Sequence, residues 1–264
     1  MKKHYVFNAP FEMKDEKGNK YLLKIEQEDS PESPRDWDNV CTMICFHRRY
    51  DLGDKHPYDN SDEFFEYILC DICNMKQEDI EELSTKEKYK LACENDNVYI
   101  QELNLYDHSG LTISTSSNYP YNDFWDAGCV GWIYVSKERA LEEWGGIPER
   151  DENGEIIRIP HHHSNGNITY SAKYTPITEE NWKEVAEYHM NNEVKTYDQY
   201  LTNDVYGYKL IKTTTEQERC PHCDEIIKEY EIEEEVDSCW GFYGDELETN
   251  GILDCIPSNL TFVE

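Results

Sequence analysis

The alternation of apolar and polar positions predicts short strands and helices rather than one repeated unit. The start of the chain reads as a ragged hairpin, with strands Tyr5–Phe7 and Tyr21–Ile25 around a turn at residues 15–19. The unbroken apolar run Val40–Phe46 has the length of a strand and predicts burial on both faces. Further strands are expected at Val98–Tyr106, Leu111–Ser114 and Val130–Val135.

Several stretches show helical spacing of their apolar side chains. In Ser61–Met75, Ser61 is the expected N-cap, and acidic residues occupy the first turn, where the helix dipole favours them. The helix expected at Thr85–Glu94 follows a capping-box pair, Ser84 and Glu87. Two more helices are expected, one from a Ser136 N-cap to Trp144 and one beginning after Thr178.

Two long alternating segments close the pattern, at Val205–Thr215 and Glu229–Phe242, and predict a hairpin with the sequence CPHC near its tip. Residues 146–176 lack such periodicity and read as a loop. The mixture of helices and hairpins predicts an α+β fold, with a mainly antiparallel sheet, flanking helices and a protruding C-terminal β-hairpin. We expect a core domain at residues 1–204 and a hairpin region at residues 205–264.

Charge adds a constraint on partners. Fifty-six Asp and Glu against 25 Lys and Arg give a formal net charge of −31 over 264 residues, whereas a small domain needs about 2–8 net charges for solubility. An aromatic content of 13% argues for a folded core beneath this acidic surface. Contacts with nucleic acid and with anionic membranes are disfavoured. We expect the partner to be a basic host protein or ribonucleoprotein complex.

The acidic residues are concentrated in the predicted hairpin. Between Glu216 and Asp237 there are ten carboxylates and two basic residues, and the stretch EIEEEVD puts charges on both faces of a strand. Such an arm would present carboxylates at intervals near those of phosphates, which is DNA mimicry. The alternative is a solvated acidic surface without a partner. The expected partner-binding residues are Glu231, Glu233, Glu234, Glu235 and Asp237.

Ten cysteines, without an apolar leader or a membrane-length apolar run, predict a reduced chain in the cytoplasm. Two C-x-x-C pairs occur, Cys70/Cys73 and Cys220/Cys223. The second pair lies between two predicted strands and predicts a structural zinc knuckle. Its other ligands stay open between His222, Cys239, Cys255 and the distant first pair. The cysteines expected to pack in the core are Cys41, Cys45, Cys93 and Cys129.

A polar cluster, HRRYDLGDKH at residues 47–56, directly follows the predicted strand Val40–Phe46. Its histidines would act as general bases and its arginines as an anion clamp in an enzyme or a nucleotide-binding protein. In the alternative reading the arginines neutralise nearby carboxylates. The common nucleotide-binding, zincin and hydrolase motifs are missing from the sequence, so we expect a binding protein rather than an enzyme. The residues of this candidate pocket are His47, Arg48, Arg49, His56, Asp107 and His108.

Three stretches, in chain order, resemble a family of uncharacterised proteins carried by bacteriophages and mobile elements. They are WDN (37–39) through HRRYDLGDKH (47–56), DHSG (107–110) with WDAGCVGWIYVSKE (125–138), and EVKTYDQYLTNDVYGY (193–208) continuing to DSCWGFYG (237–244). The resemblance implies a phage accessory protein acting in the bacterial cytoplasm and carries over no catalytic residue. Together with the charge, it indicates an inhibitor of a host defence complex of the anti-CRISPR or antirestriction type. A structural phage protein is a further alternative.

Overall fold

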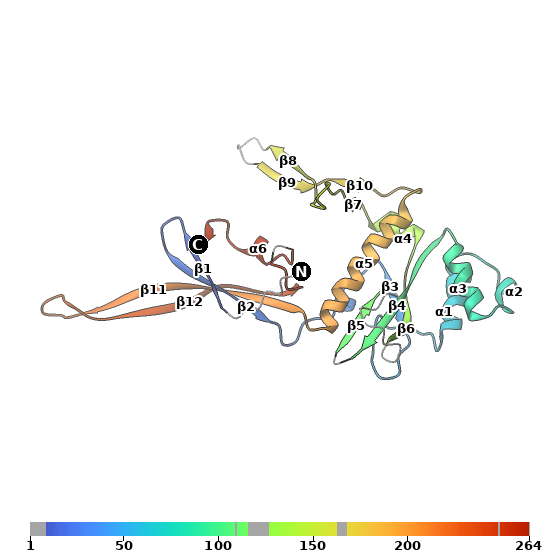
Figure 1. Cartoon of the computed structure of the whole chain (residues 1–264), viewed down its shortest axis with the longest axis horizontal. Coiled ribbons are helices and arrows are strands. Elements are labelled where there is room, and N and C mark those ends of the chain that lie inside the picture. The colour runs from blue at the N-terminus through green and yellow to red at the C-terminus, as the bar shows by residue number, and fades with distance from the viewer. Residues whose placement is uncertain (1–8, 109, 116–126, 163–167, 248, 264) are drawn as a thin grey trace. The chain divides into compact units, whose positions relative to one another are not determined.

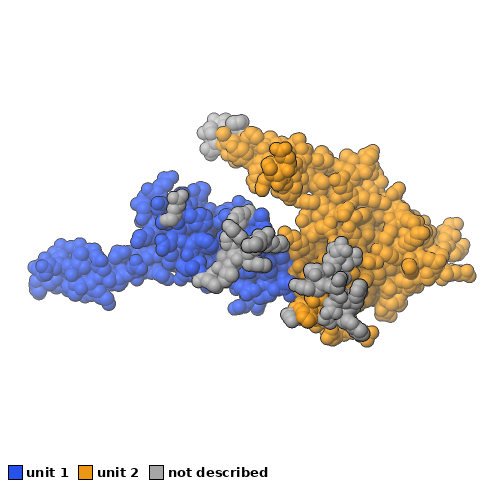
Figure 2. Space-filling view, in the orientation of Figure 1, with its two compact units in different colours: residues 1–34, 199–264 blue, residues 35–198 orange. Residues whose placement is uncertain are grey.

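The computed structural model describes residues 9–108, 110–115, 127–162, 168–247 and 249–263. Contacts between residues divide the chain into two compact units (Figure 2): residues 1–34 with 199–264 form unit 1, and residues 35–198 form unit 2. The expected division at residue 204 differs from this one, because the start of the chain pairs with the C-terminal hairpin. Helices combined with antiparallel sheets confirm the α+β class.

Unit 1 is built on a five-stranded antiparallel sheet in the order β12-β11-β2-β1-β13 (Figure 1). The expected strand at residues 5–7 lies outside the described residues, but a hairpin does form around residues 15–19, where Gly18 adopts a φ of 82°. One face of the sheet packs a core that includes Leu23, Tyr208 and Ile252. The elements are β1 (Phe11–Asp15), β2 (Lys20–Gln27), β11 (Val205–Arg219), β12 (Ile226–Tyr243), α6 (Ile252–Cys255) and β13 (Leu260–Phe262).

Unit 2 is built on a four-stranded antiparallel sheet in the order β3-β6-β4-β5. Its strands are β3 (Thr42–Cys45), β4 (Val98–Asp107), β5 (Leu111–Ser114) and β6 (Ala127–Ser136). Gly131 of β6 allows β3 to approach, because a Cβ there would lie 1.9 Å from the Ile44 carbonyl oxygen. Aromatic and aliphatic side chains join this sheet to α1 (Ser61–Tyr67), η2 (Ile68–Ile72) and α3 (Thr85–Glu94).

The long helix α5 (Trp182–Leu201) buries an apolar stripe that includes Val185, Met190 and Val194. It is fixed to the sheet of unit 2 by the Asp198 carboxylate, which accepts a hydrogen bond of 2.8 Å from the backbone N–H of Ile113. In the described part of the chain, no helix is long and apolar enough to cross a membrane.

The local capping signals are largely confirmed. Ser84 and Glu87 form the expected capping box of α3, and Ser136 caps α4 (Lys137–Glu143). For α1 the expected cap was one residue late: the side chain of Asn60, not Ser61, accepts the free N–H groups of the first turn. The predicted helix to residue 75 ends earlier, as the π-helical segment η2.

The stretch at residues 146–176 contains strands where a loop was expected. β8 pairs with β9, and β10 pairs with β7, so each forms a small two-stranded sheet. The strands of this stretch, and two short helices earlier in the sequence, were not expected. They are η1 (Pro34–Asp36), α2 (Gln77–Ile80), β7 (Gly146–Pro148), β8 (Arg158–His162), β9 (Ile168–Ala172) and β10 (Tyr174–Pro176).

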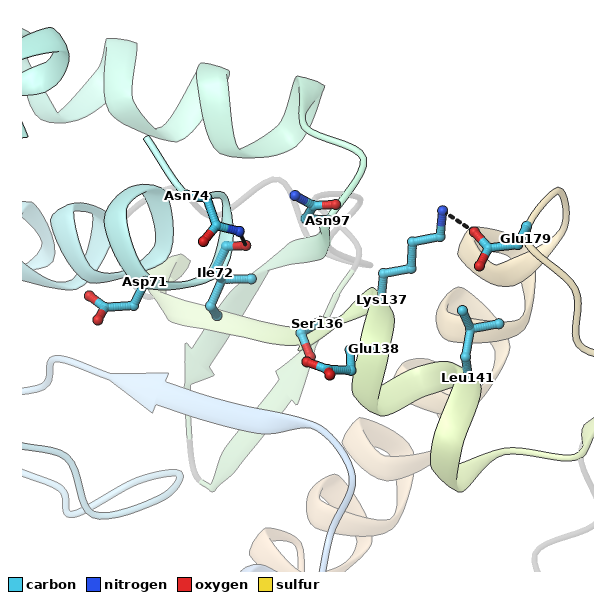
Figure 3. Close-up of a pocket in the computed structure, with 9 residues that line it drawn as sticks. All are labelled: Asp71, Ile72, Asn74, Asn97, Ser136, Lys137, Glu138, Leu141 and Glu179. Atoms are coloured by element: carbon cyan, nitrogen blue, oxygen red, sulfur yellow. Dashed lines mark hydrogen bonds and ion pairs between the residues drawn. The ribbon is translucent and has the colours of Figure 1, made fainter. Parts of the chain in front are cut away.

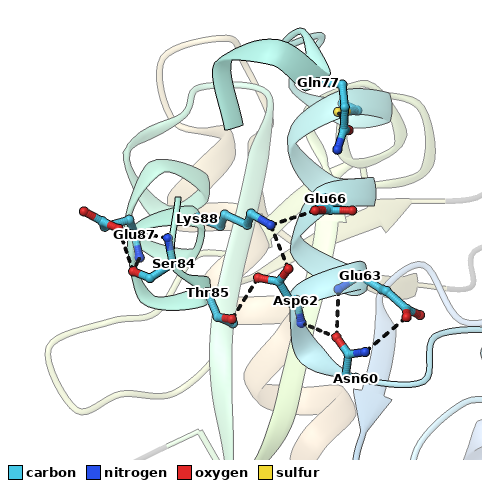
Figure 4. Close-up of polar contacts among 10 residues, drawn as sticks. Asn60, Asp62, Glu63, Glu66, Gln77, Ser84, Thr85, Glu87 and Lys88 are labelled. Atoms are coloured by element: carbon cyan, nitrogen blue, oxygen red, sulfur yellow. Dashed lines mark hydrogen bonds and ion pairs between the residues drawn. The ribbon is translucent and has the colours of Figure 1, made fainter. Parts of the chain in front are cut away.

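Two buried cations organise unit 2. The Lys88 side chain is 1% exposed, and its Nζ donates to Asp62 at 2.8 Å and to Glu66 at 2.7 Å (Figure 4). The Arg35 side chain is 4% exposed and is bound by the carboxylates of Asp54 and Glu193. Each cation therefore joins segments that are distant in the sequence, with its charge compensated.

Candidate functional site

The outer part of the β11–β12 hairpin stands free of the rest of the unit 1 sheet. Pairing of β2 with β11 ends at Thr213, whereas β12 pairs with β11 as far as Arg219. We call residues 214–232 the arm; here the two strands pair only with each other (Figure 1). Every residue of β12 from 226 to 241 is exposed. The arm therefore presents both faces to solvent, as the sequence indicated.

The register sorts the carboxylates of β12 between two faces. Residues directly opposed in an antiparallel pair lie on the same face of the sheet. Alternate positions of β12 oppose Gln217, Thr215, Thr213 and Ile211. They define the acidic face, which consists of Glu229, Glu231, Glu233 and Glu235. Glu229 was not among the expected residues, although its place in the alternation made it visible in the sequence.

The other two expected carboxylates lie apart from the acidic face. Glu234 opposes Lys212 and therefore lies on the opposite face of the hairpin. A register shift next to Val236 brings Asp237 opposite Leu210 of the core. The Asp237 carboxylate accepts a hydrogen bond of 2.8 Å from the Tyr208 hydroxyl. The pKa of the Tyr208 hydroxyl is raised, mainly because the group is removed from water and secondly because of this hydrogen bond. Asp237 thus contributes to the fold of unit 1.

The acidic face is a row of evenly spaced negative charge. Alternate residues of an antiparallel strand are about 6.8 Å apart, so its four carboxylates extend over about 20 Å. Lys24 lies 3.5 Å from Glu233, whose side chain stays 54% exposed. An exposed ion pair of this kind compensates little of the charge. The row is thus suited to binding Lys and Arg side chains.

The hairpin tip forms a compact turn around the second C-x-x-C pair. The backbone N–H of Asp224 donates to the Cys220 carbonyl at 2.9 Å, and Asp224 has a left-handed φ of 58°. Hydrogen bonds from the backbone N–H groups of His222 and Cys223, and from the Cys223 thiol, lower the pKa of the Cys220 thiol. The Cys223 thiol donates to the Glu225 carboxylate at 3.6 Å. A C-x-x-C spacing on a tight turn is that of a zinc knuckle.

The other ligands considered for zinc do not join this tip. Cys239 opposes Tyr208, and at the strand rise of about 3.3 Å per residue it lies about 40 Å from the tip. Partial burial, and then the nearby Cys239 thiol, raise the pKa of the Cys255 thiol, so Cys255 lies near Cys239. In the first pair, Cys73 is buried and Cys70 donates to Gln77. Among the described residues, no group of three or more metal-ligating side chains is present. The single chain thus offers two sulfurs at the tip.

The four cysteines that were expected to pack in the core fall into a buried pair and an exposed pair. Cys41 and Cys45 are buried, as expected, and burial raises the pKa of the Cys45 thiol to about 12. Cys93 and Cys129 are exposed, so their expected packing in the core is wrong. Both lie at positions where the sequence pattern alone did not distinguish the buried face from the solvent face.

The polar cluster after β3 is held together partly by its own contacts. Arg49 donates to Asp107 at 2.6 Å and lies over the ring of Tyr50, 5.3 Å from its centroid. The His47 ring stacks on the same tyrosine at 4.9 Å. The structure thus brings together three predicted residues, His47, Arg49 and Asp107. In this arrangement Arg49 neutralises a nearby carboxylate.

Three other predicted residues have different surroundings. The Nε2 atom of His56 lies 3.0 Å from the Cys45 carbonyl oxygen, and its ring packs 4.9 Å from Phe46. Arg48 is exposed, and His108 is exposed with its ring 5.9 Å from Tyr106. The contacts of His56 are those of a side chain packed beside the core.

Two cavities of unit 2 lie elsewhere. The larger, about 600 Å³, lies between the end of η2, with Asp71 and Asn74, and the start of α4 (Figure 3). There the Lys137 ammonium points to Glu179 and pairs with it. The smaller, about 340 Å³, is lined by Trp132 and Phe46. Of these two cavities in the described part of the chain, neither is lined by a residue of the predicted pocket.

In comparisons with known proteins, no family model, no curated protein and no solved structure significantly matches the chain.

Proposed function

We propose that the chain is an acidic inhibitor that binds the nucleic-acid-binding groove of a basic protein or ribonucleoprotein complex through the acidic face of its hairpin. The observation that carries this proposal is the row formed by Glu229, Glu231, Glu233 and Glu235 on the solvent-exposed strand β12. The resemblance of the sequence to phage proteins supports a host defence complex as the target, of the anti-CRISPR or antirestriction type.

The spacing of the row supports competition with nucleic acid. Along one DNA strand, successive charges are about 3.4 Å apart on the helix axis, so carboxylates about 6.8 Å apart match every second phosphate. Lys and Arg side chains arranged to contact phosphates would meet carboxylates at similar intervals. The net charge of −31 adds a long-range attraction that accelerates encounter with a basic groove. Salt weakens such an attraction.

The test replaces the four carboxylates of the acidic face by glutamines, which keep their shape and remove their charge. Four ion pairs of about 0.5–1 kcal/mol each give a loss of about 2–4 kcal/mol, which is about a 30- to 1,000-fold rise in Kd. A matched control removes the same charge from exposed positions of unit 2. Its substitutions are Glu78→Gln, Asp79→Asn, Glu81→Gln and Glu82→Gln.

The assay uses tagged full-length protein in bacterial lysate at low and high salt, followed by displacement of labelled duplex DNA from the captured complex. We expect the wild type and the control variant to capture a nucleic-acid-binding complex at low salt and to displace its DNA. The glutamine variant should lose both properties. The proposal is wrong if that variant captures the same complex with an unchanged salt dependence, or if the wild type displaces no DNA.

A further inference from the structure

The cysteine turn at the hairpin tip presents two metal-ligating side chains to solvent. Zn²⁺ in structural sites takes four ligands in a tetrahedron, with Zn–S distances of about 2.3 Å. The tip supplies Cys220 and Cys223, and no third metal-ligating group among the described residues joins them. The chain therefore provides half of a tetrahedral thiolate site.

The backbone of the tip already forms a tight turn between the two cysteines. The backbone N–H of Asp224 donates to the Cys220 carbonyl at 2.9 Å, and Asp224 has a left-handed φ of 58°. The Cys223 thiol donates to the Glu225 carboxylate at 3.6 Å. A tetrahedral site needs the two sulfurs about 3.8 Å apart for the Zn–S distance given above, which a C-x-x-C turn allows.

The surroundings fix this turn without help from a metal. The backbone N–H of Cys220 donates to the Glu225 carbonyl at 2.8 Å, which closes the base of the turn. Arg219 donates to the Asp224 carbonyl at 3.1 Å and to Gln217 at 2.7 Å. A preformed pair of ligands loses little conformational entropy on binding, which favours metal capture.

We propose that Zn²⁺ joins two copies of this chain at their hairpin tips, with Cys220 and Cys223 of each copy as its four ligands. A two-fold axis through the metal makes the two contributions equivalent, and the assembly closes as a dimer.

The arm makes this contact compatible with the charge of the molecule. From Thr213, where pairing with β2 ends, to Arg219 the strand advances six residues, which is about 20 Å. That length exceeds the Debye length of about 8 Å at physiological ionic strength. Repulsion between the two acidic sheets is therefore screened, whereas Asp224 and Glu225 lie beside the cysteines in each tip and repel those of the other copy. Arg219, which pairs with Asp224 at 3.4 Å, compensates part of this charge. Salt should strengthen this dimer, whereas it weakens binding by the acidic face.

The experiment titrates Zn²⁺ into the chelator-treated full-length chain in the presence of a phosphine reductant, and it follows molecular mass and bound metal. We expect the mass to double with one Zn²⁺ per two chains, and a chelator should reverse the change. Co²⁺ as a probe should give the absorption of a tetrahedral tetrathiolate site. Cys220→Ser and Cys223→Ser should each abolish the doubling. The exposed Cys255→Ser and the tip substitution His222→Ala should leave it unchanged.

Four results would overturn the proposal. They are one Zn²⁺ per chain at unchanged mass, no uptake of metal, a doubled mass that is independent of metal, and loss of zinc in His222→Ala. The cysteine variants are checked for folding by circular dichroism. Because the substituted side chains lie in a solvent-exposed turn, we expect no change in the unfolding transition.

Discussion

Replacement of Lys88 by methionine tests how a buried cation stabilises unit 2. Methionine retains the apolar stem and the volume of lysine and removes the ammonium group. In the wild type that group makes charge-assisted hydrogen bonds to Asp62 and Glu66 (Figure 4). Each bond of this type contributes about 1.5–3 kcal/mol. The side chains of the two carboxylates are 42% and 34% exposed, so in the variant water recovers about half of this sum.

The expected loss is about 1.5–3 kcal/mol of unfolding free energy. For a unit of this size it corresponds to a fall in Tm of about 3–12 °C. The measurement is urea unfolding followed by tryptophan fluorescence, with the slope m compared to verify that the same surface is exposed. The matched control is Lys90→Met on the same helix, where the side chain is 75% exposed and should change stability by less than about 0.5 kcal/mol.

The pH dependence adds an independent readout. The hydrogen bond from Lys88 is the main cause that lowers the pKa of Asp62 below its ordinary value of 3.8. A lowered pKa in the folded state means that the stabilisation is complete well above pH 3.8 and is lost as the pH falls through the folded value. The wild type should therefore lose more stability on acidification than Lys88→Met. Equal urea midpoints for Lys88→Met and Lys90→Met would refute the reasoning.

Three further substitutions have defined outcomes. Arg35→Lys should destabilise unit 2 by about 2–4 kcal/mol in urea unfolding, because lysine cannot reproduce the bidentate contact of a guanidinium. Gly131→Ala should lower the Tm by several degrees, because its Cβ would lie 1.9 Å from the Ile44 carbonyl oxygen; an unchanged Tm would contradict this close approach. Tyr208→Phe should cost about 1–2 kcal/mol by removing the hydrogen bond to Asp237. In calorimetry that cost should disappear in the Asp237→Ala background, which has no acceptor, if the pair is the cause.

Local sequence signals predicted local structure well. Ser84 and Glu87 marked the start of α3 because a capping box needs only residues within one turn. The start of α1 was placed one residue late, since Asn60 and Ser61 are both good caps and the backbone geometry selects Asn60. Strands β8 and β9 were missed because the Pro and His residues of β8, and the Ser, Asn and Gly residues between the two strands in the sequence, resemble a loop.

In the candidate site, too, the sequence predicted the features that depend on neighbouring residues and missed those that depend on contacts between distant residues. Alternation from Glu229 onward indicates one acidic face, because side chains of a strand alternate between faces. The register shift that moves Asp237 to the core face depends on pairing with β11, which no local pattern encodes. The contact between Arg35 and Glu193 joins residues 158 positions apart and likewise lies beyond any local pattern.

The division of unit 1 into two chain segments has a consequence for protein synthesis. Lys20 of β2 pairs with Thr213 of β11, and at about 5–20 residues per second the ribosome adds the second residue about 10–40 s after the first. During this delay the β1–β2 hairpin is without its partner strand, and a two-stranded hairpin is only marginally stable in water. Residues 35–198 are meanwhile complete and free to fold. Newly made chains thus pass through a stage in which the chain of unit 2 is complete and the edge of β2 is open to chaperones, or to the β2 of a neighbouring nascent chain.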